Sequence, residues 1–445
     1  MSGMANVFFE GLSRPQPKRN GHHARQHGRE GLRSSAFQWV AEHGFPTSKD
    51  EAWKYTRVAP ILQVPFKPAE PAVSRRLSAG ALEQLADDLG GAQIVVVNGY
   101  FAEELSSPTK LRELNKRAKV MSLAAALAED EEVLAPFLAR PFQEQPHAFT
   151  ALSAALAEDG VLVRIPANTT IEEPIHIVFV SDTGGAPLVS HPRCLVLAGP
   201  GSRATIVESY VGILGDVYLT NAITDIVLEE GAVVEHYKLQ NETETAFHIA
   251  LLDVRQGRDS RFSSHSLALG ASTARHEVRV RLEAAGAEVT LNGLYMPRGE
   301  QHLDNPTTIE HAAPHCTSRE LYKGIIDGRG RGSFDGRVIV RPGAFKTDAS
   351  QTNKSLLLSE SAQVDTRPRL EIFADDVKCT HGAAVGQLDE DAVFYLRSRG
   401  VPHGAARDLL TFAFASEMLG LLPLEALRSR AERVIAWRLG SAAWR

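Results

Sequence analysis

Residues 201–240 read GSRATIVESYVGILGDVYLTNAITDIVLEEGAVVEHYKLQ, and they carry the strongest structural pattern in the chain. Runs rich in β-branched and aromatic residues occur at 205–210, 222–228 and 233–239, bounded mainly by glycine, aspartate and asparagine. Such runs predict short β-strands, and no stretch of helical periodicity separates them. The pattern therefore excludes a doubly wound α/β sheet, in which helices alternate with strands.

The turns in this stretch recur along the chain. A glycine followed by small or polar residues and then a strand occurs at Gly201, Gly231, Gly257 and Gly286, in steps of 30, 26 and 29 residues. A degenerate repeat of this length is typical of a stacked β-solenoid. We therefore predict a mainly β protein with a parallel β-helix as its core. An antiparallel sandwich or barrel would show tight two-residue hairpin turns instead.

Strand-like runs on both sides of this stretch set the limits of the predicted core. We place the β-helix at residues 160–376. The segment 299–332 breaks the spacing of the turns, and we interpret it as an excursion loop. The other predicted strands are 161–165, 175–180, 194–197, 248–254, 277–282, 289–294, 337–340 and 355–358.

The N-terminal region, residues 1–159, reads as α-rich. Its residues 14–33 are rich in Arg, Lys, His, Gln and Gly, a composition that buries too little apolar surface to become ordered. We expect a solvated arm there rather than a metal site formed by His22, His23 and His27.

Helical and extended patterns mix in the rest of this region. The predicted elements are a helix ending at Gly44, a helix starting from a capping box at Ser48 and Glu51, helices at 82–89, 123–138 and 150–158, and a strand at 94–97.

The C-terminal region, residues 377–445, is predicted to be a helical domain. Asp389 is placed to cap a first helix that ends before Gly400, and further helices are expected at 405–419 and from Pro423 onward. We expect these helices to cover the open edge of the solenoid, with their remaining surface available to a partner.

Composition limits the classes of function. A hydrophobic fraction of 43%, a net charge of -6 and a pI near 6.3 describe a globular chain with no general attraction to nucleic acid or to anionic membranes. Three widely spaced cysteines fit a reducing compartment rather than a disulfide framework. Since we also find no export signal and no membrane-spanning pattern, we expect a cytoplasmic protein.

The motif Cys379-Thr-His381 is the main candidate site. In an extended strand, side chains two positions apart leave the same face, so the thiol and the imidazole can bind one metal or sulfur partner. Two ligands are too few for a closed metal or iron–sulfur site, which normally takes four. We therefore expect another chain to complete the site, although packing alone also explains a cysteine beside a histidine.

Other motifs give weaker signals. His311-Ala-Ala-Pro-His315-Cys316 is a second thiol and imidazole pairing, equally consistent with a ligand site and a structural turn. Asp375-Asp376 fits a solvated turn better than acid–base chemistry. Gly328-Arg-Gly-Arg-Gly332 lacks the following helix that a phosphate-binding loop needs.

Four segments resemble the SufB/SufD family of the SUF iron–sulfur cluster assembly system. They are FPTSKDEAWKYT (45–56), HAAPHCTSRELYKG (311–324), KTDASQTNKSLLL (346–358) and FADDVKCTHG (373–382). The similarity spans nearly the whole chain and is greater to the SufD branch than to the SufB branch.

The resemblance implies a right-handed β-helix flanked by helical regions, acting as a non-catalytic scaffold. By similarity, the chain pairs with a SufB paralogue and holds the SufC ATPase through its C-terminal helices. The nascent iron–sulfur cluster then forms at the SufB–SufD interface, with His381 and Cys379 on this side. The family is also linked to reduced flavin, and self-association of the isolated chain stays open.

Two other functions remain as alternatives. Many parallel β-helices are carbohydrate-active enzymes, but those usually carry an export signal and cluster carboxylates on neighbouring rungs. A purely structural subunit, with Cys379 and His381 as packing residues, is the second alternative.

Overall fold

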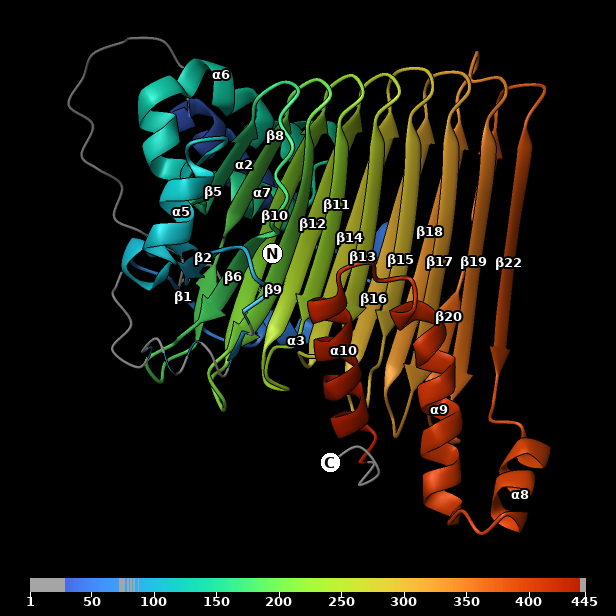
Figure 1. Ribbon diagram of the computed structural model, residues 1–445. Coiled ribbons are helices and arrows are strands. Elements are labelled where there is room, and N and C mark those ends of the chain that lie inside the picture. Colours follow the sequence, from blue (N-terminus) through green and yellow to red (C-terminus); the bar gives the residue numbers. More distant parts are fainter. Residues whose placement is uncertain are drawn as a thin grey trace.

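The structure, a computed structural model, describes residues 29–440 except for 72–76, 78, 79, 81, 83, 84 and 87. Its core is a β-solenoid in which the chain passes alternately through two sheets (Figure 1). The strands are parallel from one turn to the next. The exceptions lie at the N-terminal end, where β3 pairs antiparallel with β2 and β4 pairs antiparallel with β5. The predicted mainly β fold with a parallel β-helix core is therefore confirmed.

Each turn of the solenoid, here called a rung, contributes strands to both sheets. The first sheet contains β4 (Lys119–Ser122), β5 (Gly160–Ile165), β8 (Arg193–Ala198), β10 (Tyr218–Leu228), β12 (Phe247–Gln256), β14 (Thr273–Leu282), β16 (His302–His311), β18 (Arg331–Val340), β20 (Gln363–Thr366) and β21 (Arg369–Ile372), with β1 (Lys67–Pro68) and β7 (Leu188–Ser190) beside them. The second sheet contains β3 (Tyr100–Phe101), β2 (Ala92–Val97), β6 (Ile175–Ser181), β9 (Arg203–Gly212), β11 (Val233–Gln240), β13 (Arg261–Ala268), β15 (Glu288–Tyr295), β17 (Thr317–Ile326), β19 (Asp348–Leu357) and β22 (Lys378–Gly386).

The lumen between the sheets holds the main apolar core. Side chains at matching positions of successive strands stack on one another, because the register passes unchanged between neighbouring rungs; Val234, for example, lies opposite Ala204 on one side and Phe262 on the other. Alternate residues face the lumen and the outside. The register therefore decides which residues meet along the solenoid axis.

The segment 299–332 is not an excursion loop, and that prediction is wrong. Strands β16 and β17 lie within it and continue both sheets in register. Both strands consist mainly of polar residues, and their β-branched residues are few: Thr307, Thr308 and Ile309 in β16, and Thr317, Ile325 and Ile326 in β17. Pairing with both neighbouring rungs holds these residues in the sheets despite their weak strand propensity.

The N-terminal region covers the outer face of the first sheet. Helices α2 (Arg29–His43), α6 (Leu123–Glu144) and α7 (Ala148–Leu156) contribute to an apolar cluster with outward residues of β7, β10 and β12. The region also contributes strands to the solenoid that starts at residue 160, because β2 pairs with β6 and β4 pairs with β5. Its shorter elements are α3 (Ala59–Leu62), α5 (Pro108–Leu114) and the 3₁₀ turns at Glu51–Trp53 and Glu103–Leu105.

Most of the N-terminal predictions that the described residues test are confirmed, and one is wrong. The helices at 123–138 and 150–158 and the strand at 94–97 are confirmed, as is the helix that ends at Gly44. The capping box at Ser48 is wrong: the Asp50 carboxylate accepts a hydrogen bond from the Thr47 amide (2.7 Å), and only a 3₁₀ turn follows.

Two of the N-terminal predictions fall partly outside the described residues. They are the arm up to residue 28, with His22, His23 and His27, and the helix at 82–89, of which residues 83, 84 and 87 lie outside them. Residues 29–33, which we assigned to the arm, belong to α2. There Arg29 and Arg33 donate hydrogen bonds to the carbonyl oxygen of Ala157.

The C-terminal helices do not cover the open edge of the solenoid, which corrects our expectation. Helices α9 (His403–Leu419) and α10 (Glu425–Arg438) pack on the outer face of the second sheet, over apolar residues such as Leu239, Leu294 and Ile325 (Figure 1). The buried Lys323 ammonium donates to the Phe414 carbonyl oxygen (2.9 Å) and pairs with Glu417. These outward apolar side chains explain the position of the helices, because they would otherwise be exposed to water.

The first C-terminal helix, α8 (Glu390–Ser398), projects beyond the solenoid and contacts α9 (Figure 1). Its predicted cap is confirmed, since the Asp389 carboxylate accepts from the Asp391 amide (2.9 Å). The solenoid itself reaches Gly386 rather than ending at residue 376, where we had placed the start of the helical domain. Among the described helices, none is long and apolar enough to cross a lipid bilayer.

Glycine 293 tests the rung-to-rung packing. It lies opposite the buried Tyr322, and a Cβ atom at this position would lie 2.2 Å from the Tyr322 ring. We expect Gly293→Ala to lower the unfolding free energy by about 1–3 kcal/mol through overpacking, measured by thermal or urea unfolding. The matched variant is Gly382→Ala on β22, where the space around the new Cβ is open. Equal stability of the two variants would contradict this packing.

Candidate functional site

Strand β22 is the last rung of the second sheet and carries both Cys379 and His381. It pairs in parallel with β19, and in the described part of the chain no strand pairs with its other edge. The backbone at these residues is extended, which is the condition under which we expected the two side chains to share one face of the chain. That face points into the lumen, because Cys379 lies opposite the buried Ala349 and packs against the luminal core.

The two side chains differ in exposure. Cys379 is half-buried and His381 is exposed at the open end of the solenoid. Burial raises the pKa of the Cys379 thiol above its ordinary value. The group therefore stays a thiol at neutral pH until a metal ion or a positive group favours the thiolate.

The described residues do not surround this pair with further ligands. Among them, no group of three or more His, Cys, Asp or Glu side chains is placed to hold a metal ion. Four ligands are usual for a structural zinc site and for the common iron–sulfur clusters. The strand therefore presents two side chains of ligand type, at an edge that no described strand covers.

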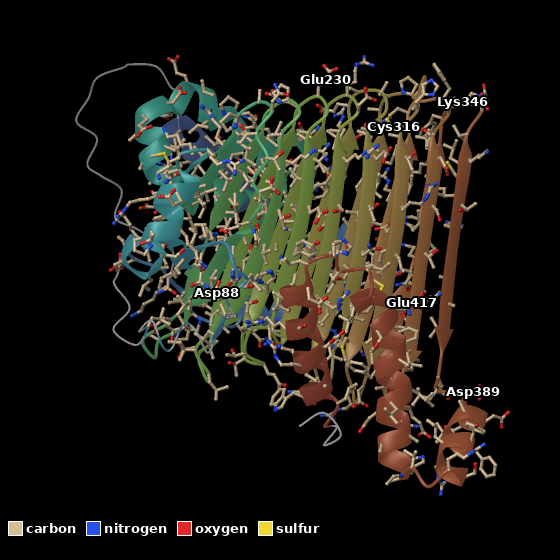
Figure 2. The ribbon with its side chains drawn as sticks, in the orientation of Figure 1. Asp88, Glu230, Cys316, Lys346, Asp389 and Glu417 are labelled. Atoms are coloured by element: carbon tan, nitrogen blue, oxygen red, sulfur yellow. The ribbon has the colours of Figure 1, made fainter. Side chains whose placement is uncertain are left out.

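The second thiol and imidazole pairing does not form a site. His311 is buried in the lumen, where its Nε2 atom lies 2.9 Å from the Ser318 hydroxyl, and burial lowers the pKa of His311 to about 4. His315 lies at a corner of the solenoid with its ring against Phe345. Cys316 lies near the same end of the strands as Lys346 (Figure 2), and its buried thiol donates to the Ala284 carbonyl oxygen (3.4 Å). These groups have structural partners.

The other motifs from the sequence also have structural roles. Asp376 has a positive φ of 56° in the turn before β22 and forms an ion pair with Lys346 (2.5 Å), so a turn explains it better than acid–base chemistry does. Gly328–Gly332 forms the turn between β17 and β18 and enters a strand rather than a helix.

Sequence reasoning missed two residues that lie in line with His381. Register places Glu320 of β17, Gln351 of β19 and His381 of β22 at equivalent positions of successive rungs. Both Glu320 and Gln351 are buried, and the Gln351 Nε2 atom donates to Glu320 Oε2 at 2.6 Å. Residues 350–355 are all polar, so the sequence carries no alternation that would mark 351, 353 and 355 as inward, and only the register shows their alignment with His381.

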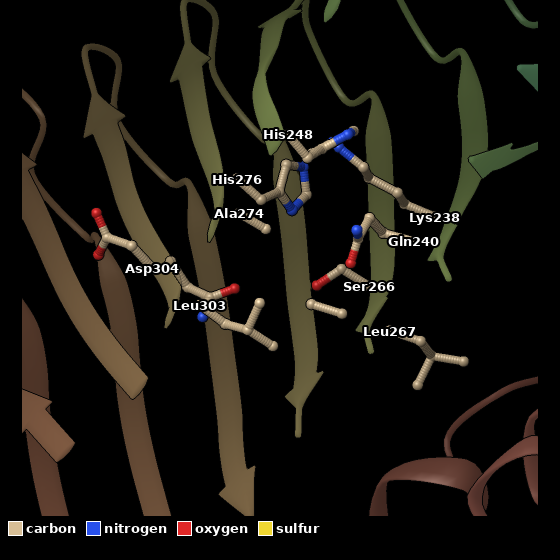
Figure 3. A pocket seen from close by; sticks show the side chains of 11 residues that line it. Lys238, Gln240, His248, Ser266, Leu267, Ala274, His276, Leu303 and Asp304 are labelled. Carbon is tan, nitrogen blue, oxygen red and sulfur yellow. The ribbon is translucent and has the colours of Figure 1, made fainter. Parts of the chain in front are cut away.

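A separate polar cluster lies in the middle of the lumen (Figure 3). Lys238, His248 and His276 line a small cavity between the sheets, and the His248 Nδ1 atom lies 2.8 Å from Glu242. Burial lowers the pKa of Lys238 to about 8. This cluster comes from β11, β12 and β14, several rungs away from β22, so it is distinct from the candidate site.

Comparisons with known proteins give a consistent family. Residues 179–414 match the model of the SUF system FeS cluster assembly SufBD core domain, and residues 23–177 match that of the SufBD protein N-terminal region. The chain is 32% identical to an iron–sulfur cluster assembly SufBD family protein of Synechocystis, covering 91% of this chain and 90% of that relative. It is 30% identical to the iron–sulfur cluster assembly protein SufD of Escherichia coli, covering 92% of each.

Glu320 makes stability depend on pH. Burial raises its pKa to about 7, well above that of an exposed glutamate, so the fold favours the protonated form. This contribution is present below about pH 4.5 and is lost as pH rises through about 7. Between these limits the native chain should lose about 3 kcal/mol of unfolding free energy that Glu320→Gln does not lose.

Urea unfolding at both ends of this pH range measures the difference. Glu360→Gln changes an exposed glutamate and serves as the control. Parallel pH profiles of the native and Glu320→Gln chains would show that the carboxyl is not held in its protonated form.

Proposed function

Because the chain belongs to the SufBD family of iron–sulfur cluster assembly proteins, we propose that it is a SufD-type scaffold subunit. In this proposal it works in a complex with a SufB-type paralogue and the SufC ATPase. It contributes half of an assembly site and catalyses no reaction of its own. The family match removes the support for a carbohydrate-active enzyme.

A single observation carries the proposal: two ligand-type side chains, Cys379 and His381, lie on the inner face of a strand whose outer edge pairs with no described strand. Thiolate and imidazole are ligands of iron and of iron–sulfur clusters. A cluster held here needs further ligands, which a partner meeting the same edge would supply. The cluster is then the product of the complex rather than a resident group of this chain.

The open edge offers a defined way for the partner to bind. The Lys378 amide donates to the Thr347 carbonyl oxygen on the β19 side (2.9 Å). Since backbone groups alternate in direction along a parallel strand, those of Cys379, His381 and Ala383 point to the free edge. A partner strand added there would gain main-chain hydrogen bonds and place its own side chains beside His381.

Exposed apolar residues surround this edge. Ile372, Phe373 and Val385 expose 42%, 58% and 49% of their surface at the last rung. Large apolar side chains gathered at an unpaired edge favour burial against another protein. We propose that a SufB-type chain covers them in the complex, and that a second copy of this chain is the competing occupant when the subunit is isolated.

Helix α8 is the proposed contact for the ATPase. Its Phe394 and Tyr395 expose 69% and 58% of their surface, while α9 and α10 are held against the second sheet. Residues 387–389 join α8 directly to β22. ATP hydrolysis in the SufC partner would therefore displace α8 and, through this short link, open the last rung to iron and sulfur.

A flavin has weaker support. The luminal cavity around Lys238 has a volume of about 10 Å³, far below the roughly 300–1,000 Å³ of small-molecule sites. It does not fit a flavin ring system.

The free cysteines fit a reducing compartment, and we propose that the protein acts in the cytoplasm.

Replacing the proposed ligand tests the site. We expect His381→Ala to lower the yield of iron–sulfur cluster on the purified complex by about tenfold or more, since even residues that only support a ligand matter at that level. The complex itself should remain intact on gel filtration. His315→Asn removes an exposed histidine at a solenoid corner and is the control. Unchanged cluster yield in the intact His381→Ala complex would remove this residue from the site.

The free edge of β22 has its own test. Ala383→Pro removes an amide that points away from β19, so the isolated chain should keep its unfolding temperature while its affinity for the SufB-type partner falls about tenfold or more. Ala384→Pro removes the neighbouring amide, which points toward β19, and should destabilise the last rung in the isolated chain. Native affinity of Ala383→Pro for the partner would refute docking at this edge.

A further inference from the structure

Gln351 and Glu320 lie directly behind His381 in the lumen. Parallel pairing places Glu320 opposite Gln351 and Gln351 opposite His381, so the three side chains occupy equivalent inward positions of β17, β19 and β22. Gln351 exposes 1% of its surface and Glu320 exposes 4%. His381 is thus the exposed end of a row whose other two members are buried.

Only the nitrogen of the Gln351 side-chain amide has a hydrogen-bond partner among the described residues. Its Nε2 atom donates to Glu320 Oε2 at 2.6 Å, toward the preceding rung. Its Oε1 atom is buried and has no hydrogen-bond partner in the described part of the chain. A buried carbonyl oxygen without a donor costs about 1–3 kcal/mol.

The surrounding structure makes room for this amide. A Cβ atom at Gly336, on β18 across the lumen, would lie 2.1 Å from the Gln351 Nε2 atom. Only glycine leaves the space that the amide occupies. An apolar side chain at 351 would avoid the unpaired oxygen, so burial alone does not explain why a glutamine occupies this position.

The following rung carries a side chain that could donate to this oxygen. The His381 side chain lies opposite Gln351 in the register and makes no hydrogen bond or ion pair with any described residue, and an imidazole has an N–H to donate. Histidines that bind metals usually donate their second ring N–H to an acceptor, which fixes the tautomer and the ring orientation. The free Oε1 atom of Gln351 lies at the neighbouring position of the same inward row.

We infer that Gln351, held by Glu320, accepts a hydrogen bond from His381 and so orients its imidazole toward the open end of the solenoid. Gln351 and Glu320 are positioning residues in this scheme, since neither contacts the cluster. The scheme rests on the proposed function for its biological purpose, but the hydrogen bond itself exists or fails without any cluster.

Nitrogen NMR of the isolated chain tests the hydrogen bond directly. The chain is labelled with ¹⁵N-histidine, and the His381 signals are assigned by their loss in His381→Ala. We expect one dominant tautomer in the native chain, a mixture of the two tautomers in Gln351→Leu, and a single tautomer again in Gln351→Glu, which restores an acceptor. Gln256→Leu is the control, because it removes another buried luminal glutamine, on β12. His381 signals that are identical in the native and Gln351→Leu chains would overturn the inference.

Cluster yield on the purified complex separates this inference from the proposed function. We expect Gln351→Leu to lower the yield about tenfold, in the range of other residues that support a ligand, with recovery in Gln351→Glu. If the His381 tautomer changes in Gln351→Leu while His381→Ala gives a normal cluster yield, the hydrogen bond is supported and the role of His381 in assembly is refuted. An unchanged tautomer in Gln351→Leu would refute the hydrogen bond whatever the yield.

Discussion

A parallel solenoid must end, and its last strand then has one edge without a hydrogen-bonding neighbour. In this chain that strand is β22, and the rest of the arrangement depends on it. Helices cover the outer faces of both sheets, yet neither α9 nor α10 is placed over the edge. The ligand-type pair Cys379 and His381 lies on the same strand, facing the lumen. Strand β22 therefore combines an exposed edge, which most proteins protect, with two ligand-type side chains, which are fewer than the four ligands that a cluster usually takes.

The three proposed roles of the chain, in cluster assembly, partner binding and contact with the ATPase, all involve residues near the short segment 387–389. Residues 387–389 connect β22 to α8, whose Phe394 and Tyr395 are exposed, while Lys323 and Glu417 hold α9 against the solenoid. A force applied to α8 would reach β22 before it disturbed the buried core. On the luminal side, Gln351 and Glu320 occupy the inward positions that precede His381 in the register. In the proposed scheme the site is displaced from outside through α8 and oriented from inside by Gln351.

The sequence predicted the architecture better than the details of the site. Glycine turns at regular steps were enough to predict stacked rungs, and Asp389 predicted the start of α8. Strands β16 and β17 were missed because their polar residues lack a strand signature and are held by the neighbouring rungs. The position of α9 and α10 depends on which residues of the second sheet face outward, and the register that decides this is not visible in one sequence. The shared face of Cys379 and His381 required an extended backbone, which the sequence left as a condition, and Gln351 and Glu320 could be related to them only through pairing across rungs.

The central claim is that this chain cannot hold a cluster alone and acts by presenting its open rung to a partner. Anaerobic incubation with ferrous iron and sulfide, applied in parallel to the isolated chain and to its complex with the SufB-type and SufC partners, tests that claim most directly. Bound iron and sulfide are measured after desalting. We expect a stable cluster on the complex and none retained by the isolated chain as a monomer. A stable cluster on the monomeric chain would contradict the account.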